Sequence, residues 1–170
     1  MTAYVALLRA VNVGGTGKLP MTKLAAICTD AGFTAVKTYI ASGNVVFKSA
    51  AGAAKVKSEL ETRLEAYAKK TIGVVVRTAA EMAQIQQANP FPKMAANRTV
   101  AIFLDDAPPS DALTHATGRN NEEMRLGIRE IYVHYGDGMA KTKLRIPAAR
   151  SGTARNMNTV AKLAEMAANL

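Results

Sequence analysis

Hydrophobic and polar positions follow two different periods in the first half of the chain. Short runs of continuous or alternating apolar residues lie between longer segments whose apolar residues recur every three or four positions. The first pattern predicts strands and the second predicts helices. The order of elements is therefore βαββαβ, which is typical of a ferredoxin-like sandwich and predicts an α+β fold for residues 1–78. The strands are expected at 3–8, 35–40, 44–48 and 74–78, and the helices at 20–31 and 53–69.

Residues 79–170 are expected to form a second α/β half, packed on the first within a single domain of residues 1–170. Its first helix should end before Asn89, because the two prolines that follow cannot continue a helix. No internal sequence repeat separates the two halves. The expected elements are a helix at 79–88, a strand at 99–104, a short helix at 111–116, an antiparallel hairpin of 123–128 and 130–135, a basic loop at 136–153 and a C-terminal helix that begins near Thr153.

The composition excludes several classes of protein. Of the 170 residues, 49% are hydrophobic, but no apolar run approaches the ~20 residues that a membrane span needs, so no membrane partner is expected. The N-terminus has no signal-peptide pattern, which makes the cytoplasm the expected location. The single cysteine, Cys28, lies beside Leu24 and Ile27 and is expected to be a buried structural thiol.

Neither histidine has a ligand partner at a useful spacing. His115 and His134 lie far apart, and no cysteine or carboxylate stands near either one at metal-ligand spacing. His134 falls in the second strand of the predicted hairpin, where a structural role is expected. The sequence therefore predicts no metal and no other cofactor, and it leaves the oligomeric state open.

Basic residues concentrate at the two ends of the chain. The formal net charge is +9; residues 1–58 contain seven Lys and Arg against one acid, and residues 138–170 contain six against one. If the two ends meet in space, they create a positive field that attracts phosphates or nucleic acid. The alternative is a solvated basic surface that keeps the protein soluble.

A glycine-rich loop precedes the first predicted helix. Gly14, Gly15 and Lys18 suggest a phosphate loop, but Asn12 stands where that motif needs its first glycine and Leu19 where it needs Ser or Thr. The exposed N–H groups of such a loop, at a helix N-terminus, can still hold an anion. An ordinary strand-to-helix loop is the alternative.

The segment from Thr153 to Thr159 carries polar side chains at helical spacing. With Thr153 as the N-cap, Arg155, Asn158 and Thr159 would share one face of the first turns. A guanidinium, an amide and a hydroxyl at the positive end of a helix dipole would bind an anion or a polar ligand. Simple capping and a solvent-facing turn are the alternative.

Four stretches resemble an uncharacterised bacterial family, domain of unknown function 1697. These are residues 4–15, 38–47, 89–91 and 153–160, in the same order along nearly the whole chain. The resemblance implies an α+β fold of ferredoxin-like character, and it implies no activity.

The leading hypothesis is a ligand site built from these stretches, at strand-end loops and a helix N-terminus. It would bind a phosphate-bearing ligand, either a nucleotide or nucleic acid. A metal-independent enzyme for a small polar metabolite and a protein-interaction module are the alternatives, and no catalytic residue is identified. The predicted ligand-binding residues are Arg9, Asn12, Gly14, Gly15, Lys18, Ser42, Gly43, Asn44, Lys143, Arg155, Asn156 and Asn158.

Overall fold

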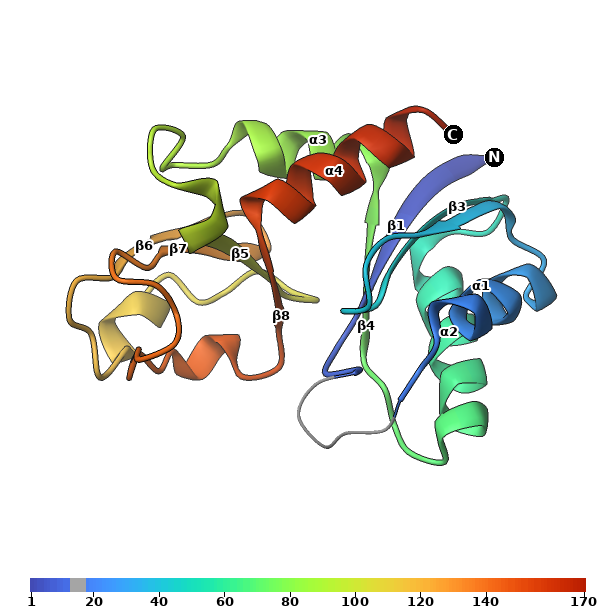
Figure 1. The fold of residues 1–170 in the computed structure, drawn as a ribbon, viewed down its shortest axis with the longest axis horizontal. Coiled ribbons are helices and arrows are strands. Elements are labelled where there is room, and N and C mark those ends of the chain that lie inside the picture. Colours follow the sequence, from blue (N-terminus) through green and yellow to red (C-terminus); the bar gives the residue numbers. More distant parts are fainter. Residues whose placement is uncertain (13–17) are drawn as a thin grey trace. The chain divides into compact units, whose positions relative to one another are not determined.

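The chain is divided into two compact units (Figure 1). The structure is a computed structural model that describes residues 1–12 and 18–170. Unit 1 consists of Met1–Ala83 and Lys162–Leu170, and unit 2 consists of Gln84–Ala161. Each unit contains one four-stranded antiparallel sheet, which confirms the predicted α+β class.

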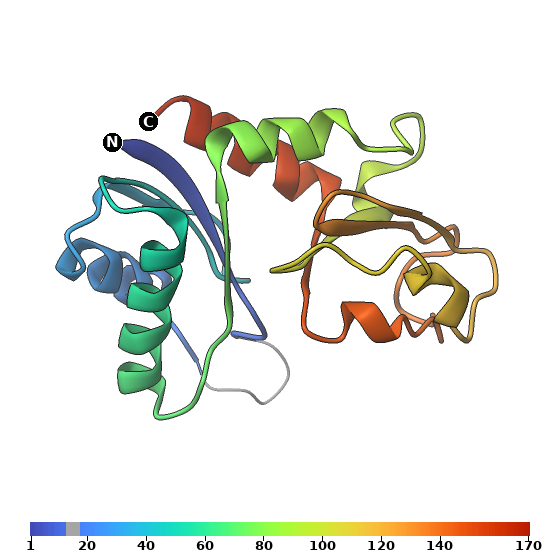
Figure 2. The same ribbon diagram turned by 180° about the vertical axis from the view of Figure 1, so that it is seen from behind.

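Unit 1 has the ferredoxin-like arrangement that the sequence predicts. Its sheet has the order β2-β3-β1-β4, and every neighbouring pair is antiparallel. The helices α1 and α2 lie on one face of this sheet (Figures 1 and 2). The elements are β1 (Thr2–Leu8), α1 (Met21–Asp30), β2 (Thr34–Thr38), β3 (Asn44–Ser49), α2 (Ala53–Ala68) and β4 (Val74–Thr78).

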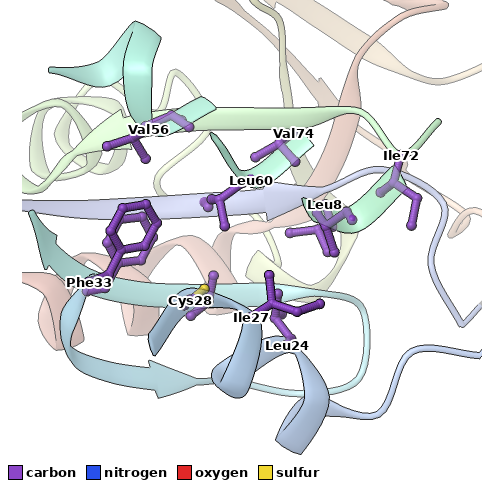
Figure 3. Packing of buried hydrophobic residues seen from close by; sticks show 14 of the residues in the cluster. Leu8, Leu24, Ile27, Cys28, Phe33, Val56, Leu60, Ile72 and Val74 are labelled. Atoms are coloured by element: carbon purple, nitrogen blue, oxygen red, sulfur yellow. The ribbon is translucent and has the colours of Figure 1, made fainter. Parts of the chain in front are cut away.

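The core of unit 1 lies between these helices and the sheet (Figure 3). Leu24 and Cys28 of α1 and Leu60 of α2 point toward Leu8 at the end of β1 and toward the neighbouring strands. Burial raises the pKa of the Cys28 thiol to about 12, as expected for a structural thiol in an apolar core.

Unit 2 has a sheet of the order β6-β7-β5-β8 with short 3₁₀ helices (η) between its strands. The longer helices α3 (Ala79–Gln87) and α4 (Met157–Ala168) each contribute residues to both units. Among the helices of the described residues, none has both the length and the apolar character that a membrane crossing requires. The elements of unit 2 are η1 (Ala96–Arg98), β5 (Thr99–Phe103), η2 (Ala112–His115), β6 (Glu123–Leu126), β7 (Glu130–His134), η3 (Pro147–Ala149) and β8 (Thr153–Asn156).

The two sheets have the same strand order when β5 to β8 are matched to β1 to β4. In both sheets an arginine on an edge strand lies opposite the first strand of the unit: Arg77 of β4 is opposite Val5 of β1, and Arg155 of β8 is opposite Ala101 of β5. Both arginines are buried. Unit 2 is therefore a second ferredoxin-like sheet, a relationship that the sequence does not reveal.

The expected C-terminal helix begins later than predicted, at Met157, because Thr153–Asn156 forms strand β8. The segment is polar and only four residues long, so it carries no apolar alternation that would predict a strand. Its pairing with β5 decides the conformation.

Candidate functional site

The predicted residues of unit 1 gather at the end of its sheet where β1 finishes. The backbone N–H of Leu8 donates to the carbonyl of Gly43 over 2.9 Å, and that of Arg9 donates to Gly73 over 2.9 Å. A Cβ on Gly73 would lie 3.8 Å from the Cβ and 3.9 Å from the Cδ of Arg9, so the Arg9 side chain runs along Gly73. The structure therefore brings residues 9–12 and 42–44, which the sequence proposes for one site, close to one another.

Asn12 holds this loop in place rather than presenting a free amide. Its Nδ2 donates to the carbonyls of Leu19 and Ala41, both over 2.8 Å, and its Oδ1 accepts the N–H of Leu19 over 2.6 Å. These bonds connect the segments before α1 and before β3. Asn12 thus has a role in loop structure, and its direct contact with a ligand stays a prediction.

Ser42 and Gly43 belong to the turn between β2 and β3, and Asn44 is the first residue of β3. Asn44 is fully buried, and its Nδ2 donates to the carbonyl of Tyr39 and to the hydroxyl of Ser42, both over 2.9 Å. Gly43 has a φ of +90°, and an added Cβ would lie 2.6 Å from the Cγ2 of Val11. This turn is fixed by packing, which makes it a rigid wall for the loops around it.

A cavity of about 280 Å³ lies beside these loops, within unit 1. Its walls combine apolar side chains with two lysines and an aromatic ring. Val11, Leu19 and Ile72 are buried, whereas Lys18, Lys70 and Tyr67 are exposed. The lining residues are Ala10, Val11, Lys18, Leu19, Tyr67, Ala68, Lys70 and Ile72.

Two further lysines, Lys23 and Lys69, neighbour residues that line this cavity. The Nζ of Lys23 lies 5.2 Å from the centre of the Tyr67 ring, and Lys69 ends α2 with a left-handed φ of +60°. Helix α1 begins at Met21 without a side-chain hydrogen bond at its N-cap, Pro20. Lysine ammonium groups and a helix N-terminus both favour a bound anion.

Of the eight described residues that line the cavity, only Lys18 was predicted from the sequence as a site residue, and the two polar ones that were missed are Tyr67 and Lys70. Tyr67 and Lys70 lie at the end of α2, more than 45 positions after Lys18. The Lys69-Lys70 pair that follows the predicted helix was a usable signal, because basic residues at a helix C-terminus are placed by the backbone close to the loops at that end.

The predicted residues of unit 2 do not form the helix-start cluster that their spacing suggested. Arg155 is only 8% exposed in β8, where its Nη1 donates to Thr153 Oγ1 over 2.7 Å and to the carbonyl of Ala154 over 3.0 Å. Burial lowers the pKa of its guanidinium to about 10. Thr153 belongs to the strand and is not the helix cap.

Asn156 is the N-cap of α4 in its place. Its Oδ1 accepts the N–H of Thr159 over 3.0 Å, which satisfies one of the free donors of the first turn. Asn158 is exposed and Thr159 is buried, so they do not share a face.

Lys143 lies in the loop before β8, beside a second polar cavity of about 440 Å³ in unit 2. Glu122 also lines this cavity, and it accepts hydrogen bonds from the Thr142 hydroxyl over 2.5 Å and from the Asn120 N–H over 2.6 Å. These bonds lower the pKa of the Glu122 carboxyl below its ordinary value. Arg155, Asn156 and Asn158 do not line this cavity.

Three predictions remain, on the role of His134, on the loop glycines and on a joint site. His134 is structural, since its Nδ1 lies 2.9 Å from Thr99 Oγ1, which itself donates to the carbonyl of Ala95. Gly14 and Gly15 lie outside the described residues. A site formed jointly by residues of both units stays a prediction.

Comparison with known proteins identifies the family and the fold. The family described as "Protein of unknown function (DUF1697)" matches residues 1–132. No curated protein matches the chain. The solved structure of the conserved bacterial protein SP0830 from Streptococcus pneumoniae is similar over 98% of each chain, with 24% sequence identity and a TM-score of 0.80. At this identity the similarity establishes the fold alone.

Proposed function

Because this chain belongs to the DUF1697 family, whose description assigns no activity, we propose its function from its own residues: unit 1 binds a small phosphate-bearing ligand of the nucleotide class. The observation that carries the proposal is the cavity of about 280 Å³, whose lining combines Lys18, Lys70 and the Tyr67 ring with buried apolar side chains. The proposal assumes a bacterial cytoplasm, where such ligands are abundant.

The size of the cavity favours a small ligand over a nucleic-acid duplex. Ligand sites typically have volumes of about 300–1,000 Å³, and this cavity, of about 280 Å³, lies just below that range. A mononucleotide or a sugar phosphate is of suitable size.

The chemistry of the walls favours a ligand with an anionic end and a flat or apolar end. Lys18 and Lys70 provide mobile point charges for a phosphate, and Arg9, on the neighbouring loop, adds a third cation at the same end of the sheet. Val11, Leu19 and Ile72 provide the apolar surface that a base or sugar edge would cover. Asn12, Ser42 and Asn44 support the loops.

Isothermal titration calorimetry of the full chain with AMP, and separately with inorganic phosphate, tests the proposal. We expect AMP to bind, and the double substitution K18E and K70E to weaken binding at least tenfold, because each change replaces an attraction by a repulsion. Lys55→Glu is the matched control, since Lys55 is exposed on α2 and does not line the cavity. Equal losses in both proteins would overturn the assignment of this site.

A labelled single-stranded oligonucleotide, titrated across a salt series, separates the two ligand classes that the sequence left open. Competition between AMP and the oligonucleotide supports a shared phosphate site. Tight, strongly salt-dependent binding of the oligonucleotide that AMP does not displace would replace the proposal by nucleic-acid binding.

A further inference from the structure

An apolar cavity with charged walls lies in unit 2, and none of its lining residues is used for the proposed function. Its volume is about 420 Å³, within the usual range of small-molecule sites. The apolar lining includes Ile102 of β5, together with Leu144 and Ile146 of the loop between β7 and β8, and the charged lining residues are Arg145 and Arg150. Apolar contacts and positive charge therefore occur in one cavity.

The cavity has a defined framework. Thr117 and Arg145 form an isolated antiparallel bridge, with hydrogen bonds of 2.9 Å and 2.8 Å between their backbones. Pro147 begins the 3₁₀ helix η3, which continues the wall. At the far end of the loop Gly152 passes close to β5, because a Cβ there would lie 2.8 Å from the Cγ2 of Ile102. The segment is thus held at one end by the bridge to Thr117, in the loop between η2 and β6, and at the other end by close packing of Gly152 against β5.

The polar groups of the walls can bind an anion. Arg145 uses its backbone for the bridge to Thr117, and its side chain is exposed, as is that of Arg150. Both residues line the cavity, as do Thr117 and Tyr135, whose side chains carry hydroxyl groups. Burial, with a smaller effect of Glu122, raises the pKa of Tyr135 above its ordinary value, so its hydroxyl stays a hydrogen-bond donor at neutral pH.

We infer that this cavity binds a small organic acid, a carboxylate with an aromatic or branched aliphatic body. A planar guanidinium matches the two oxygens of a carboxylate and can bind both at once. A phosphate has more oxygens and more charge to satisfy, and the largely apolar walls around Ile102, Leu144, Ile146 and Pro147 offer few further donors. The apolar body of the ligand would cover these side chains.

The first test uses phenylacetate as the probe and amide NMR spectra of the full chain as the readout. We expect shifts of the amide signals of residues 144–150 and of Thr117, with saturation at submillimolar to millimolar concentration. Phenylacetamide, which has the same body without the charge, should bind at least tenfold more weakly. Binding of the amide as tight as that of the acid, shifts confined to residues outside the cavity, or no shifts at all would each overturn the inference.

Two kinds of variant then test separately whether binding needs the arginine charges and whether it needs the space of the cavity. R145A combined with R150A should weaken phenylacetate binding at least tenfold, while Arg125→Ala, which removes an exposed guanidinium outside the cavity, should change it less than twofold. Ala149→Phe fills the cavity and should abolish binding without removing a charge. If the double variant and Arg125→Ala behave alike, the inference fails.

Two further measurements distinguish this site from the proposed nucleotide site and from a phosphate site. The K18E and K70E double variant should bind phenylacetate with unchanged affinity, since both lysines belong to unit 1. A large loss in that variant would assign the binding to unit 1 and overturn the inference. Phenyl phosphate should bind more weakly than phenylacetate; tighter binding would exclude the assignment to carboxylates.

Discussion

In unit 1, helices of 10 and 16 residues cover one face of the sheet, whereas in unit 2 the equivalent connections contain 3₁₀ helices of 4 and 3 residues and longer loops. The strand order is the same in both sheets, and in each a buried arginine lies on the edge strand that pairs with the first strand of the unit. The comparison shows that this strand order does not require full helices. It requires only that each connection brings enough apolar surface back to the sheet.

The helices over the sheet of unit 1 and the loops over the sheet of unit 2 differ in how completely they fill the space beside the sheet. Long helices present regular rows of side chains, and in unit 1 Leu24, Leu60 and Leu64 are completely buried against the sheet. In unit 2 the corresponding contacts come from partly buried residues such as Leu113, Ile146 and Ala148. Loops fill space less completely than helices, and the cavity of about 420 Å³ lies under this cover.

The strongest way to test the comparison is to remove one leucine from each cover. Leu60→Ala should destabilise the protein by about 4 kcal/mol, because it leaves a cavity in a closed core. Leu113→Ala should cost about 1 kcal/mol, since Leu113 is only partly buried in η2. Urea unfolding measures both. Equal losses would show that the loops of unit 2 pack as tightly as the helices of unit 1.

Substitutions at two glycines distinguish the cost of backbone strain from the cost of close packing. Gly43→Ala should cost about 3 kcal/mol, because the residue has a φ of +90° and the new Cβ would lie 2.6 Å from Val11 and 2.9 Å from Leu8. Gly138→Ala in unit 2 has a similar φ of +84° and no atom within 4 Å, so only about 1 kcal/mol is expected. Thermal unfolding of both variants measures the difference between the two costs. Equal costs would show that the turn at Gly43 can move to accept the new Cβ.

The helix that follows each sheet provides a third comparison. Thr78 and Glu81 form a reciprocal capping box at α3, with bonds of 3.1 Å and 2.8 Å, whereas Asn156 caps α4 with a single bond to Thr159. Thr78→Ala and Asn156→Ala should each cost about 1 kcal/mol, with the larger loss at Thr78. Urea unfolding of the two variants gives the order. A larger loss at Asn156 would contradict this interpretation of the caps.

The smallest expected effect is a dependence on pH in unit 2. The hydrogen bonds from Thr142 and Asn120 keep the pKa of Glu122 below its ordinary value. A carboxyl with a lowered pKa in the folded state contributes stability above the unfolded pKa of about 4.3, and this stability is lost as the pH falls through the folded value. Glu122→Gln should remove that part of the dependence. Hydrogen exchange of β6 and β7 amides between pH 5 and pH 3 measures it, with β1 and β3 as internal controls.

The elements of unit 1 could be predicted closely because their patterns are strong and local. The strand at Val74–Thr78 was predicted with the observed bounds, and the helix at 53–69 ends one residue earlier, at Ala68. The strand Thr153–Asn156 was missed, because a four-residue edge strand with three polar residues is recognisable only from its partner, β5. Because this segment was predicted to begin a helix, Arg155 was expected in a first helical turn and not in a strand.

The candidate site could be predicted only in part, for a similar reason. Residues 9–12 and 42–44 were chosen correctly as neighbours because both follow or precede central strands of a predictable sheet. The Lys69-Lys70 pair was a signal for Lys70 that was not used, whereas the contribution of Tyr67 to the cavity depends on where the last turn of α2 lies, which the sequence pattern does not specify.

The sequence by itself determined the α+β class, the order of strands and helices in unit 1, the burial of Cys28 and the structural role of His134. These properties follow from periodicity and from side-chain chemistry over short stretches of chain. The tertiary structure alone decided that residues 84–161 form a sheet of the same order, that Asn12 and Asn156 bind backbone groups, and which residues enclose the cavities. Such properties depend on contacts between segments far apart in the sequence, which local patterns do not specify.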